Sequence, residues 1–435
     1  MTKKYQIKDA NTNDALELAV PATVNVAMNE IAADMREGLL ALAVGAGLQV
    51  MGALMDADVA ALAGPRGRHD PDRTATRHGT EAGSVTLGGR RVSVTRPRVC
   101  AVDGTGELAV PSYELFSSTE ILGRMAMERM LGGLSTRRYR VGLEPVGEQV
   151  SGSASSTSKS AVSRKFVAMT EHALGDLLAA DLSTLDLVAF MVDGVHFAES
   201  CCVVALGIDI AGIKHPLALV EGSTENATLV TELIVGLRER GLDVTRPVLA
   251  VLDGSKALRR AVLDVFDHPV LARCQLHKIR NVKDHLPQRM RAGVERRMRD
   301  AYHARSALEA EALLSVLARE LDKTHPSAAA SLREGMAETL TVLRLDVPPS
   351  LARTLRSTNA IESMIGICRE HAKNVKRWRD GQMALRWCAA GMVEASRQFR
   401  RVNGHAHLAA LRAALEREVA QPVGTTCHDE AVNVA

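Results

Sequence analysis

The run DLVAFMVDG at residues 186–194 is the first of three successive apolar runs in the middle of the chain. It is followed by SCCVVALGIDIAG (200–212) and HPLALVEG (215–222), and each run contains Gly. Short apolar runs that are rich in β-branched residues and bounded by turn residues are typical of buried β-strands. We therefore expect three consecutive strands here, with the middle one largely buried.

Further along, strands alternate with helices. PVLAVLDG (247–254) and PVLARC (269–274) are typical of a fourth and a fifth strand. An amphipathic helical segment precedes each of them, at 223–242 and 255–266. Three strands in succession, followed by strands that alternate with helices, predict an α/β domain with a mixed sheet.

Two aspartates occupy equivalent positions in this pattern. Asp193 ends the first predicted strand and Asp253 ends the fourth, and each precedes a Gly. The ends of strands, and the loops that follow them, are where α/β sheets place ligand and metal sites. If the two strands are neighbours, the carboxylates could share a divalent cation such as Mg²⁺. A single Asp at a strand-to-helix turn can instead be a helix N-cap, and Asp253 before SKAL fits that alternative too.

A third carboxylate would complete a site for two metal ions. Glu362 is the candidate, in RSTNAIESM (356–364) at the start of a predicted helix. His277 follows the fifth strand by a few residues, and its imidazole can donate a hydrogen bond to a phosphate oxygen. Cys274 lies three residues before it, but a structural zinc site needs four ligands and only His285 is added nearby. We therefore favour Cys274 as a packed residue that orients the turn.

The composition indicates a folded, cytosolic protein. The 435 residues are 46% hydrophobic and 24% charged, which argues against a disordered chain. No run of about 18 consecutive apolar residues occurs, and the first residues lack the apolar stretch of a secretory signal, so we expect no membrane association. Seven Cys without a C-x-x-C pair argue against a disulfide framework and fit a reducing compartment.

The start of the chain is predicted to be helical and to serve packing or self-association. Apolar residues recur at three- and four-residue spacing in residues 24–63, which favours two helices broken near Gly45–Gly47. Residues 64–83 are polar and rich in Gly, Pro and Arg, so we expect a loop or linker there.

A basic hairpin is predicted next. Residues 84–99 alternate apolar and polar side chains about Gly88-Gly89, which is a two-residue hairpin signal. Arg90 and Arg91 come just past the turn and could lie along a nucleic-acid groove. A plain surface hairpin is the alternative.

A helix-turn-helix reader of DNA is predicted between this hairpin and the α/β domain. Residues 117–143 have a helical pattern, residues 151–160 are rich in Ser, and a helical pattern then resumes. The first turns of the second helix carry Lys159, Arg164 and Lys165. Helix–loop–helix patterns are common, so this motif alone does not establish DNA binding.

The distribution of charge favours a nucleic-acid partner more than the net charge of +3 does. Residues 61–100, 269–310 and 369–401 are rich in Lys and Arg and are separated by neutral or acidic segments. Several phosphate-contacting surfaces would have this distribution, although each segment could also be a solvated helix face. The candidate contacts here are Lys278, Arg280, Arg377 and Trp378, the last of which could stack on an unpaired base or pack within a helix.

The order of four motifs resembles a known family. MVDGVHF, VLDGSKAL, CQLHKIRN and STNAIES occur in the order, and at about the spacing, of DDE transposases of the Mutator-like bacterial insertion-sequence group. The resemblance covers roughly residues 80–400. It implies a ribonuclease-H-like catalytic core, interrupted by an all-helical insertion before the Glu. It also implies that Asp193, Asp253 and Glu362 are the catalytic, metal-binding triad for two Mg²⁺ or Mn²⁺ ions.

The expected organisation follows from these segments. We expect a helical N-terminal region, a DNA-binding region, the first part of the core, a helical insertion, the C-terminal core helices and a tail, at residues 1–80, 81–180, 181–276, 277–350, 351–418 and 419–435.

The leading hypothesis is a DNA transposase that binds the terminal inverted repeats of a mobile element and carries out metal-dependent strand cleavage and strand transfer. Its partners would be double-stranded DNA of the element ends and the target, and a homodimer or higher oligomer would assemble on that DNA in the cytoplasm, at the nucleoid. The alternatives are a ribonuclease-H-like nuclease without strand joining and a non-enzymatic DNA-binding regulator with a decayed core. A kinase or nucleotide hydrolase is disfavoured because no phosphate-binding glycine motif precedes a helix.

Overall fold

The computed structural model describes residues 22–420, except 69, 144–145, 147–149, 151, 153 and 223–225. The predicted tail therefore lies almost entirely outside the described residues. The chain divides into two compact units, one made of Met1–Met130 with Leu134–Phe166 and the other of Leu131–Gly133 with Val167–Ala435. Each unit is described separately below.

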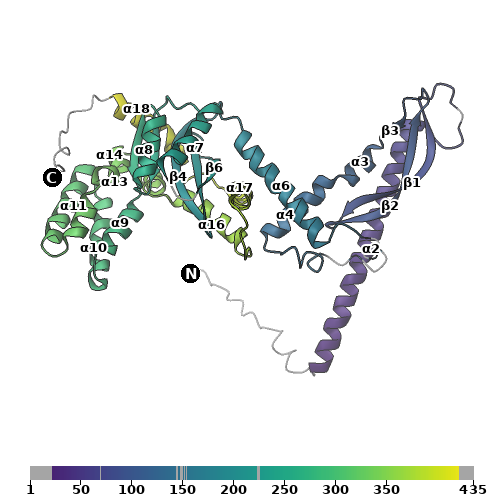
Figure 1. Cartoon of the computed structure of the whole chain (residues 1–435), viewed down its shortest axis with the longest axis horizontal. Helices are drawn as coiled ribbons and strands as arrows, with labels where there is room; N and C mark the ends of the chain where they lie inside the picture. Colours follow the sequence, from purple (N-terminus) through teal and green to yellow (C-terminus); the bar gives the residue numbers. More distant parts are fainter. Residues whose placement is uncertain are drawn as a thin grey trace, which may run out of the picture. The chain divides into compact units, whose positions relative to one another are not determined.

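The first unit combines a long helix with a small antiparallel sheet (Figure 1). The sheet has the order β1-β2-β3, and the helix packs on it through Met55 and Val59, which share a core with Val99 and Val110. The elements described up to the second unit are α2 (Ala22–Ala63), β1 (Ala75–Leu87), β2 (Arg90–Ala101), β3 (Glu107–Leu108), α3 (Pro111–Ser117), α4 (Thr119–Leu131) and α6 (Lys159–Ala179).

The long helix corrects two predictions. Helix α2 runs without a break from Ala22 to Ala63, so the expected interruption near Gly45–Gly47 is wrong. A glycine lowers helix stability by about 1 kcal/mol but does not end a helix when its neighbours are strong helix formers. The predicted loop at 64–83 is also too long, because β1 already begins at Ala75.

The predicted hairpin is confirmed. Val85 pairs with Val92 across antiparallel strands β1 and β2, and the connecting residues are Gly88 and Gly89. Both glycines have positive φ, +54° and +79°, which a two-residue turn of this kind requires and which other residues rarely adopt.

The compact helix-turn-helix is not present in the form expected. Helices α4 and α6 are separated by residues 132–158, far more than the three- or four-residue turn of such a motif. Part of this connection returns to the hairpin, because Ser155 and Arg91 exchange both backbone hydrogen bonds.

One segment of α2 is apolar enough to cross a membrane by length and composition alone. Within Ala41–Ala63, an 18-residue window has a mean hydropathy of 1.3, and 11% of that window is buried. Two of its residues, Met55 and Val59, lie in the hydrophobic core of the first unit, so the apolar character has a structural use there.

The second unit is built on a five-stranded mixed sheet, as predicted. The strand order is β6-β5-β4-β7-β8, with antiparallel pairing from β6 to β4 and parallel pairing from β4 to β8. The strands are β4 (Leu187–Phe197), β5 (Ser200–Asp209), β6 (Lys214–Gly222), β7 (Val248–Leu252) and β8 (Pro269–Arg273).

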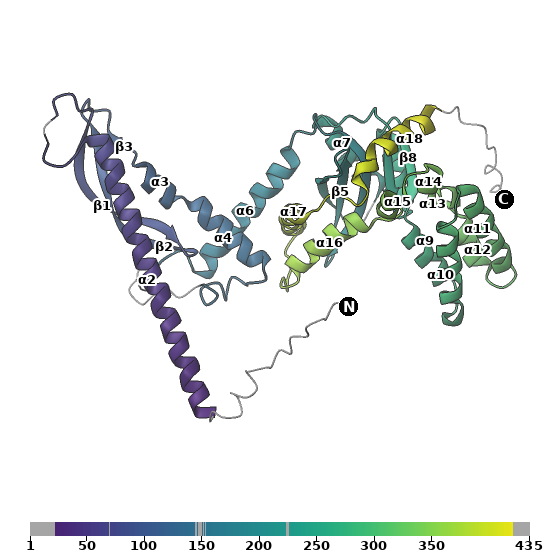
Figure 2. The ribbon, with the colours of Figure 1, turned by 180° about the vertical axis from the view of Figure 1, so that it is seen from behind.

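Helices cover both faces of this sheet (Figures 1 and 2). Helices α7 (Ala227–Glu239) and α8 (Lys256–Val265) pack on one face, where Phe190 and Val192 of β4 lie in a common core with them. Helices α16 (Asn359–Ala372), α17 (Gly381–Gln398) and α18 (Leu408–Ala420) pack on the other face. We call these the α8 face and the α16 face.

The segment between β8 and α16 is all-helical, as predicted for 277–350. It has its own hydrophobic core, which includes Val282, Met298 and Leu314. Its helices are α9 (Gln275–Asp284), α10 (Gln288–Tyr302), α11 (Ala307–Asp322), α12 (Pro326–Arg333), α13 (Met336–Thr339), α14 (Thr341–Arg344) and α15 (Pro349–Leu355). We refer to α9–α15 as the helical insertion.

Candidate active site

Asp193 and Asp253 stand at the same level on neighbouring parallel strands. Strand β4 pairs directly with β7, and the last registered pair is Met191 with Val251. Two residues further along the chain lie Asp193, inside β4, and Asp253, directly after the end of β7. The prediction that Asp193 ends its strand is therefore wrong, because β4 continues to Phe197. Because neighbouring strands lie about 4.8 Å apart, this register brings the two backbones together at one edge of the sheet.

The two aspartates also project to the same face. Phe190 and Val192 belong to the core on the α8 face, so the alternation of side chains directs Asp193 to the α16 face. The same alternation applies to β7, where Ala250 and Leu252 belong to the core on the α8 face, and it directs Asp253 to the α16 face.

Strand β8 adds Cys274 to this edge. Leu252 pairs with Arg273, and the amide of Cys274 donates to the carbonyl of Leu252 at 2.7 Å. Cys274 is therefore level with Asp253 and on the same face, and its side chain is completely buried.

The turn after β7 is ordered by its own side chains. Asp253 Oδ1 accepts a hydrogen bond from the Ser255 amide at 2.8 Å. Ser255 is the N-cap of α8 and accepts from the Leu258 amide. The alternative that Asp253 is the N-cap is therefore wrong, because Ser255 has that role.

Glu362 lies in the first turn of α16, which packs against β4. Thr358, the completely buried N-cap residue of this helix, has its Oγ1 2.7 Å from Glu362 Oε1. Thr358 Oγ1 is also 3.3 Å from His277 Nδ1 and 3.4 Å from Cys274 Sγ. Thr358 therefore connects the start of α16 to the end of β8 and the start of α9.

This network argues against a zinc site. The ligand atoms of Cys274, His277 and Glu362 lie within 4.8 Å of one another, close enough to suggest a metal centre. The hydroxyl oxygen of Thr358, however, is within hydrogen-bond distance of all three. Three ligands around a protein hydroxyl form a hydrogen-bonded cluster, whereas a structural zinc requires four.

The cluster changes the acid–base properties of two of its members. Burial raises the pKa of the Cys274 thiol, but hydrogen bonds with His277 and Thr358 outweigh it, so the net pKa lies below its usual value. The hydrogen bond with Cys274 raises the pKa of His277, burial opposes this, and the negative charges of Cys274, Glu362 and Asp253 add to the increase. His277 therefore stays protonated to higher pH than a free histidine.

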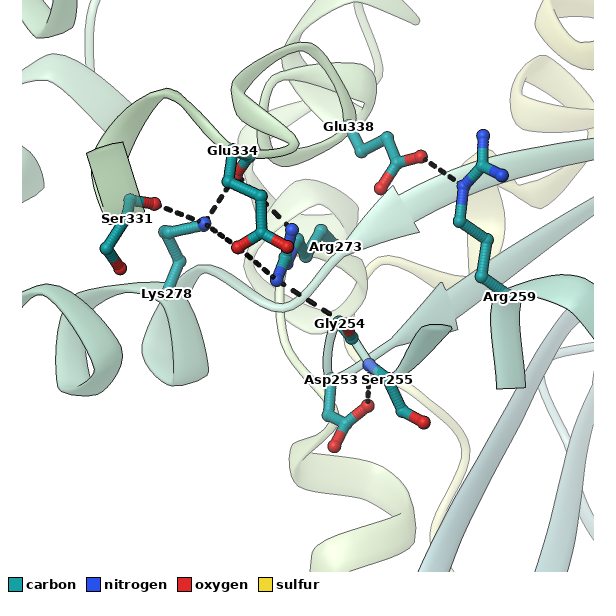
Figure 3. Close-up of polar contacts among 9 residues, drawn as sticks. All are labelled: Asp253, Gly254, Ser255, Arg259, Arg273, Lys278, Ser331, Glu334 and Glu338. Atoms are coloured by element: carbon teal, nitrogen blue, oxygen red, sulfur yellow. Dashed lines mark hydrogen bonds and ion pairs between the residues drawn. The ribbon is translucent and has the colours of Figure 1, made fainter. Parts of the chain in front are cut away.

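A second polar cluster lies next to the Asp253 turn, around a cavity of about 420 Å³ (Figure 3). Lys278 is completely buried and donates to the carbonyl oxygens of Ser331, at 2.6 Å, and Glu334. Burial and the charge of Arg273 lower the pKa of Lys278 to about 8. The predicted DNA contact of Lys278 is therefore wrong for this structure, because its ammonium group is enclosed by the helical insertion.

The candidate DNA contacts of the first unit differ in exposure. Lys159 and Arg164 are exposed on α6, whereas Arg90 is buried. Arg91 is held by neutral acceptors, including the Ser84 carbonyl at 2.8 Å.

Lys165 lies close to two other cations. Its ammonium group is buried and has no hydrogen-bond partner among the described residues. Burial and the charges of Arg91 and Arg164 lower the pKa of Lys165 to about 8. The charges that act on Lys165 are thus those of two other cations, and no carboxylate contributes to the lowering of its pKa.

The candidate contacts of the second unit are presented by α9 and by the loop between α16 and α17. Arg280 and Arg377 are exposed. Trp378 is half-buried in that loop, with its ring 4.9 Å from the Phe197 ring and 6.3 Å from the Trp387 ring. The alternative of a Trp packed within a helix is wrong in detail, because the residue packs from a loop.

Three residues of the site were not identified from sequence. Thr358 belongs to the TN-x-I-E run, so its position next to Glu362 was visible, but its contacts with Cys274 and His277 were not. Arg273 and Glu334 meet across 61 positions, and no local pattern indicates that pairing. The only sequence signal for Arg273 was a cation at the end of an apolar strand.

Comparisons with known proteins bear on the whole chain. A family model described as Transposase, Mutator family, matches residues 24–402. The chain is 29% identical over 287 residues to the transposase for insertion sequence element IS6120 of Mycolicibacterium smegmatis, covering 65% of this chain and 86% of that relative. It is 24% identical over 366 residues to the transposase for ISRM5 of Rhizobium meliloti (strain 1021), covering 83% and 90%. The chain therefore belongs to the Mutator family of transposases, which are enzymes that act on DNA.

Proposed function

We propose that this transposase binds the terminal inverted repeats of its element and uses Asp193, Asp253 and Glu362 to cleave and transfer DNA strands. The observation that carries the proposal is the register of β4 and β7, which aligns the two aspartates on the face covered by α16. Glu362 enters from the first turn of that helix. We infer that the three carboxylates meet at this end of the sheet.

The donor set fits hard divalent cations. Carboxylate oxygens are what Mg²⁺ and Mn²⁺ prefer, and the three acidic residues would hold two such ions. When bound, the ions activate the attacking oxygen and offset charge at the phosphate. We also propose that the core is ribonuclease-H-like, on the strength of three antiparallel strands followed by two parallel ones.

The surrounding residues orient this set. Thr358 holds Glu362 through its hydroxyl, and the Ser255 amide holds Asp253. His277 has Nδ1 against Thr358 and Glu362, so Nε2 is the nitrogen that can donate to a non-bridging phosphate oxygen. The hydrogen bond with Cys274 and the nearby negative charges raise the pKa of His277, which favours the protonated ring that donates this bond.

DNA contacts would come from basic side chains that the structure leaves exposed. In the first unit we propose Lys159 and Arg164, which are exposed on α6, with Arg91 beside them. Arg90 and the ammonium group of Lys165 are buried, so they are not proposed as direct contacts. In the second unit we propose Arg280 and Arg377, with Trp378 anchoring the loop that presents Arg377. We further propose that the protein acts in the cytoplasm at the nucleoid, as a dimer or higher oligomer on DNA, because two DNA ends must be joined in one reaction.

The test is strand cleavage and joining with DNA that carries the element's ends, a target plasmid and Mg²⁺. Asp193→Asn, Asp253→Asn and Glu362→Gln should each lower cleavage by about a thousandfold or more while DNA binding remains. Asp264→Asn is the matched control, since Asp264 pairs with Arg260 on the exposed surface of α8. Unchanged cleavage in Asp253→Asn would show that the triad is wrong.

The same assay separates the alternatives. Cleaved products without joined strands would indicate a nuclease that does not transfer strands. Specific binding of the ends without any cleavage by the wild-type protein would indicate a regulator.

A further inference from the structure

Arg273 occupies an unusual position at the end of β8. Its side chain is only 7% exposed, and it lies on the α8 face, opposite to its neighbour Cys274. Gly254 and Gly335, both with positive φ, lie against its guanidinium group, and a Cβ on either glycine would overlap that group. The guanidinium is therefore enclosed between the Asp253 turn and the helical insertion (Figure 3).

The polar contacts of Arg273 join the same two parts of the chain. Nη2 is 3.5 Å from the Gly254 carbonyl and 3.3 Å from Glu334 Oε2, and Nη1 is 3.3 Å from the Glu334 carbonyl. Glu334 Oε2 is also 3.6 Å from Lys278 Nζ. The Glu334 carboxylate thus balances two buried cations, Arg273 and Lys278. Removing the partner of a buried cation strongly destabilises the folded protein.

We propose that Arg273 is a positioning residue, which fixes the Asp253 turn (residues 253–255) and is itself held by Glu334 of the helical insertion. The inference rests on the proposed role of Asp253. Because the amide of Ser255 binds Asp253 Oδ1 within this turn, a shift of Gly254 would move the carboxylate. The insertion would then control the geometry of the site through Glu334, in addition to contributing His277 from α9.

A second ion pair in the same cavity provides the matched control. Arg259 Nε is 2.8 Å from Glu338 Oε1, and this pair also joins the sheet domain to the insertion, from α8 to α13. The Arg259 and Glu338 side chains bond each other, and Arg259 meets the Asp253 turn through its backbone amide, which donates to the Ser255 carbonyl at 3.1 Å and is kept in any Arg259 variant. Removing the Arg259–Glu338 pair should cost the insertion one ion pair to the sheet domain, as removing the Arg273–Glu334 pair does, but should leave the Asp253 turn in place.

The experiment compares Arg273→Gln and Glu334→Gln with Arg259→Gln and Glu338→Gln. Binding of Mn²⁺ to the protein without DNA, followed by electron paramagnetic resonance, should weaken about 10- to 100-fold in the first two variants and less than about twofold in the controls. In the cleavage assay the first two should lower kcat without changing KM for DNA. Wild-type Mn²⁺ affinity in a folded Arg273→Gln protein would overturn the proposal.

A third readout does not depend on metal. Amide hydrogen exchange in a peptide that covers residues 253–258 should become faster in Arg273→Gln and Glu334→Gln and stay unchanged in the controls. If Asp253→Asn leaves cleavage intact, the proposed function fails while faster exchange still supports the positioning of the turn. If exchange is unchanged, the positioning inference fails whatever Asp253 does.

Arg273→Lys guards against a variant that does not fold. Lys retains the charge but lacks the planar group that fits between two glycines. We expect it to restore the melting temperature more fully than the Mn²⁺ affinity. Equal restoration of both would mean that charge balance alone matters, and would overturn the geometric role.

Discussion

Thr358, the N-cap residue one turn before Glu362, has its Oγ1 2.7 Å from Glu362 Oε1. A hydroxyl has a single proton to donate, and the carboxylate is its nearest acceptor, so Thr358 fixes the rotamer of Glu362. The amide of Thr358 is in turn 3.4 Å from Cys274 Sγ, which ties the helix start to strand β8. The placement of Glu362 thus depends on Cys274, which lies 84 positions before Thr358.

Thr358→Val tests this dependence. The variant keeps the shape of the side chain and removes the hydroxyl, so Glu362 should lose its orientation and cleavage should fall about 10- to 100-fold. Thr358→Ser should retain most activity, and Thr354→Val, which removes an exposed hydroxyl bonded to Asn403, should have no effect. A Thr358→Val protein that cleaves DNA at the wild-type rate would contradict the role of the hydroxyl.

Lys165 predicts a pH dependence of stability. Its pKa is lowered to about 8 in the folded state, whereas the unfolded chain holds the proton up to about 10.5. Between these values the unfolded state binds more protons, so stability increases with pH. Relative to Lys165→Met, the wild type should gain on the order of 2 kcal/mol from pH 7.5 to 10.5 in urea unfolding. Lys159→Met, at an exposed position on the same helix, should show no such difference.

Variants of Trp378 and Arg377 should separate two roles of this loop, its packing on Phe197 and its contact with DNA. Trp378→Phe should retain the ring contact with Phe197 and the DNA affinity, whereas Trp378→Ala should lower stability by about 1–3 kcal/mol and weaken DNA binding. Arg377→Gln should weaken binding and reduce its salt dependence without affecting stability. The anchor role is excluded if Trp378→Ala is as stable as wild type yet no longer binds DNA, since the ring would then act on the bases.

The Cys274 cluster predicts an absence of structural zinc. Protein purified without added metal should contain well under one equivalent of zinc by mass spectrometry, and a zinc-selective chelator should not change the melting temperature. One equivalent of zinc that disappears in His277→Ala would show that a metal can displace the Thr358 hydroxyl.

The sequence predicted the sheet well because its signals are local. The apolar run of β7 correctly places Asp253 directly after a strand, whereas the prediction that Asp193 ends its strand is wrong, because β4 continues to Phe197 through its pairing with β5. For the two aspartates to come together, β4 and β7 also had to be neighbours in the sheet. This pairing concerns residues 60 positions apart, and composition does not determine it.

Predictions that depended on exposure were less successful. Lys278 belongs to a basic helical segment and looked like a surface cation, yet Glu334, 56 positions later, encloses it. Gly45 and Gly47 looked like a helix break, but a glycine weakens a helix without necessarily ending it. In both cases the outcome depends on neighbours that a short window of sequence does not contain.

The alternation of side chains along β8 constrains the number of residues in this strand. Arg273 serves the α8 face and Cys274 the α16 face, although they are consecutive. Deleting one residue within β8 would exchange the two environments, putting a cation among the acidic groups and a thiol against the glycines. Relatives should therefore tolerate a longer or shorter excursion between Gln275 and Ser357 far more readily than a one-residue change in the strand that precedes it.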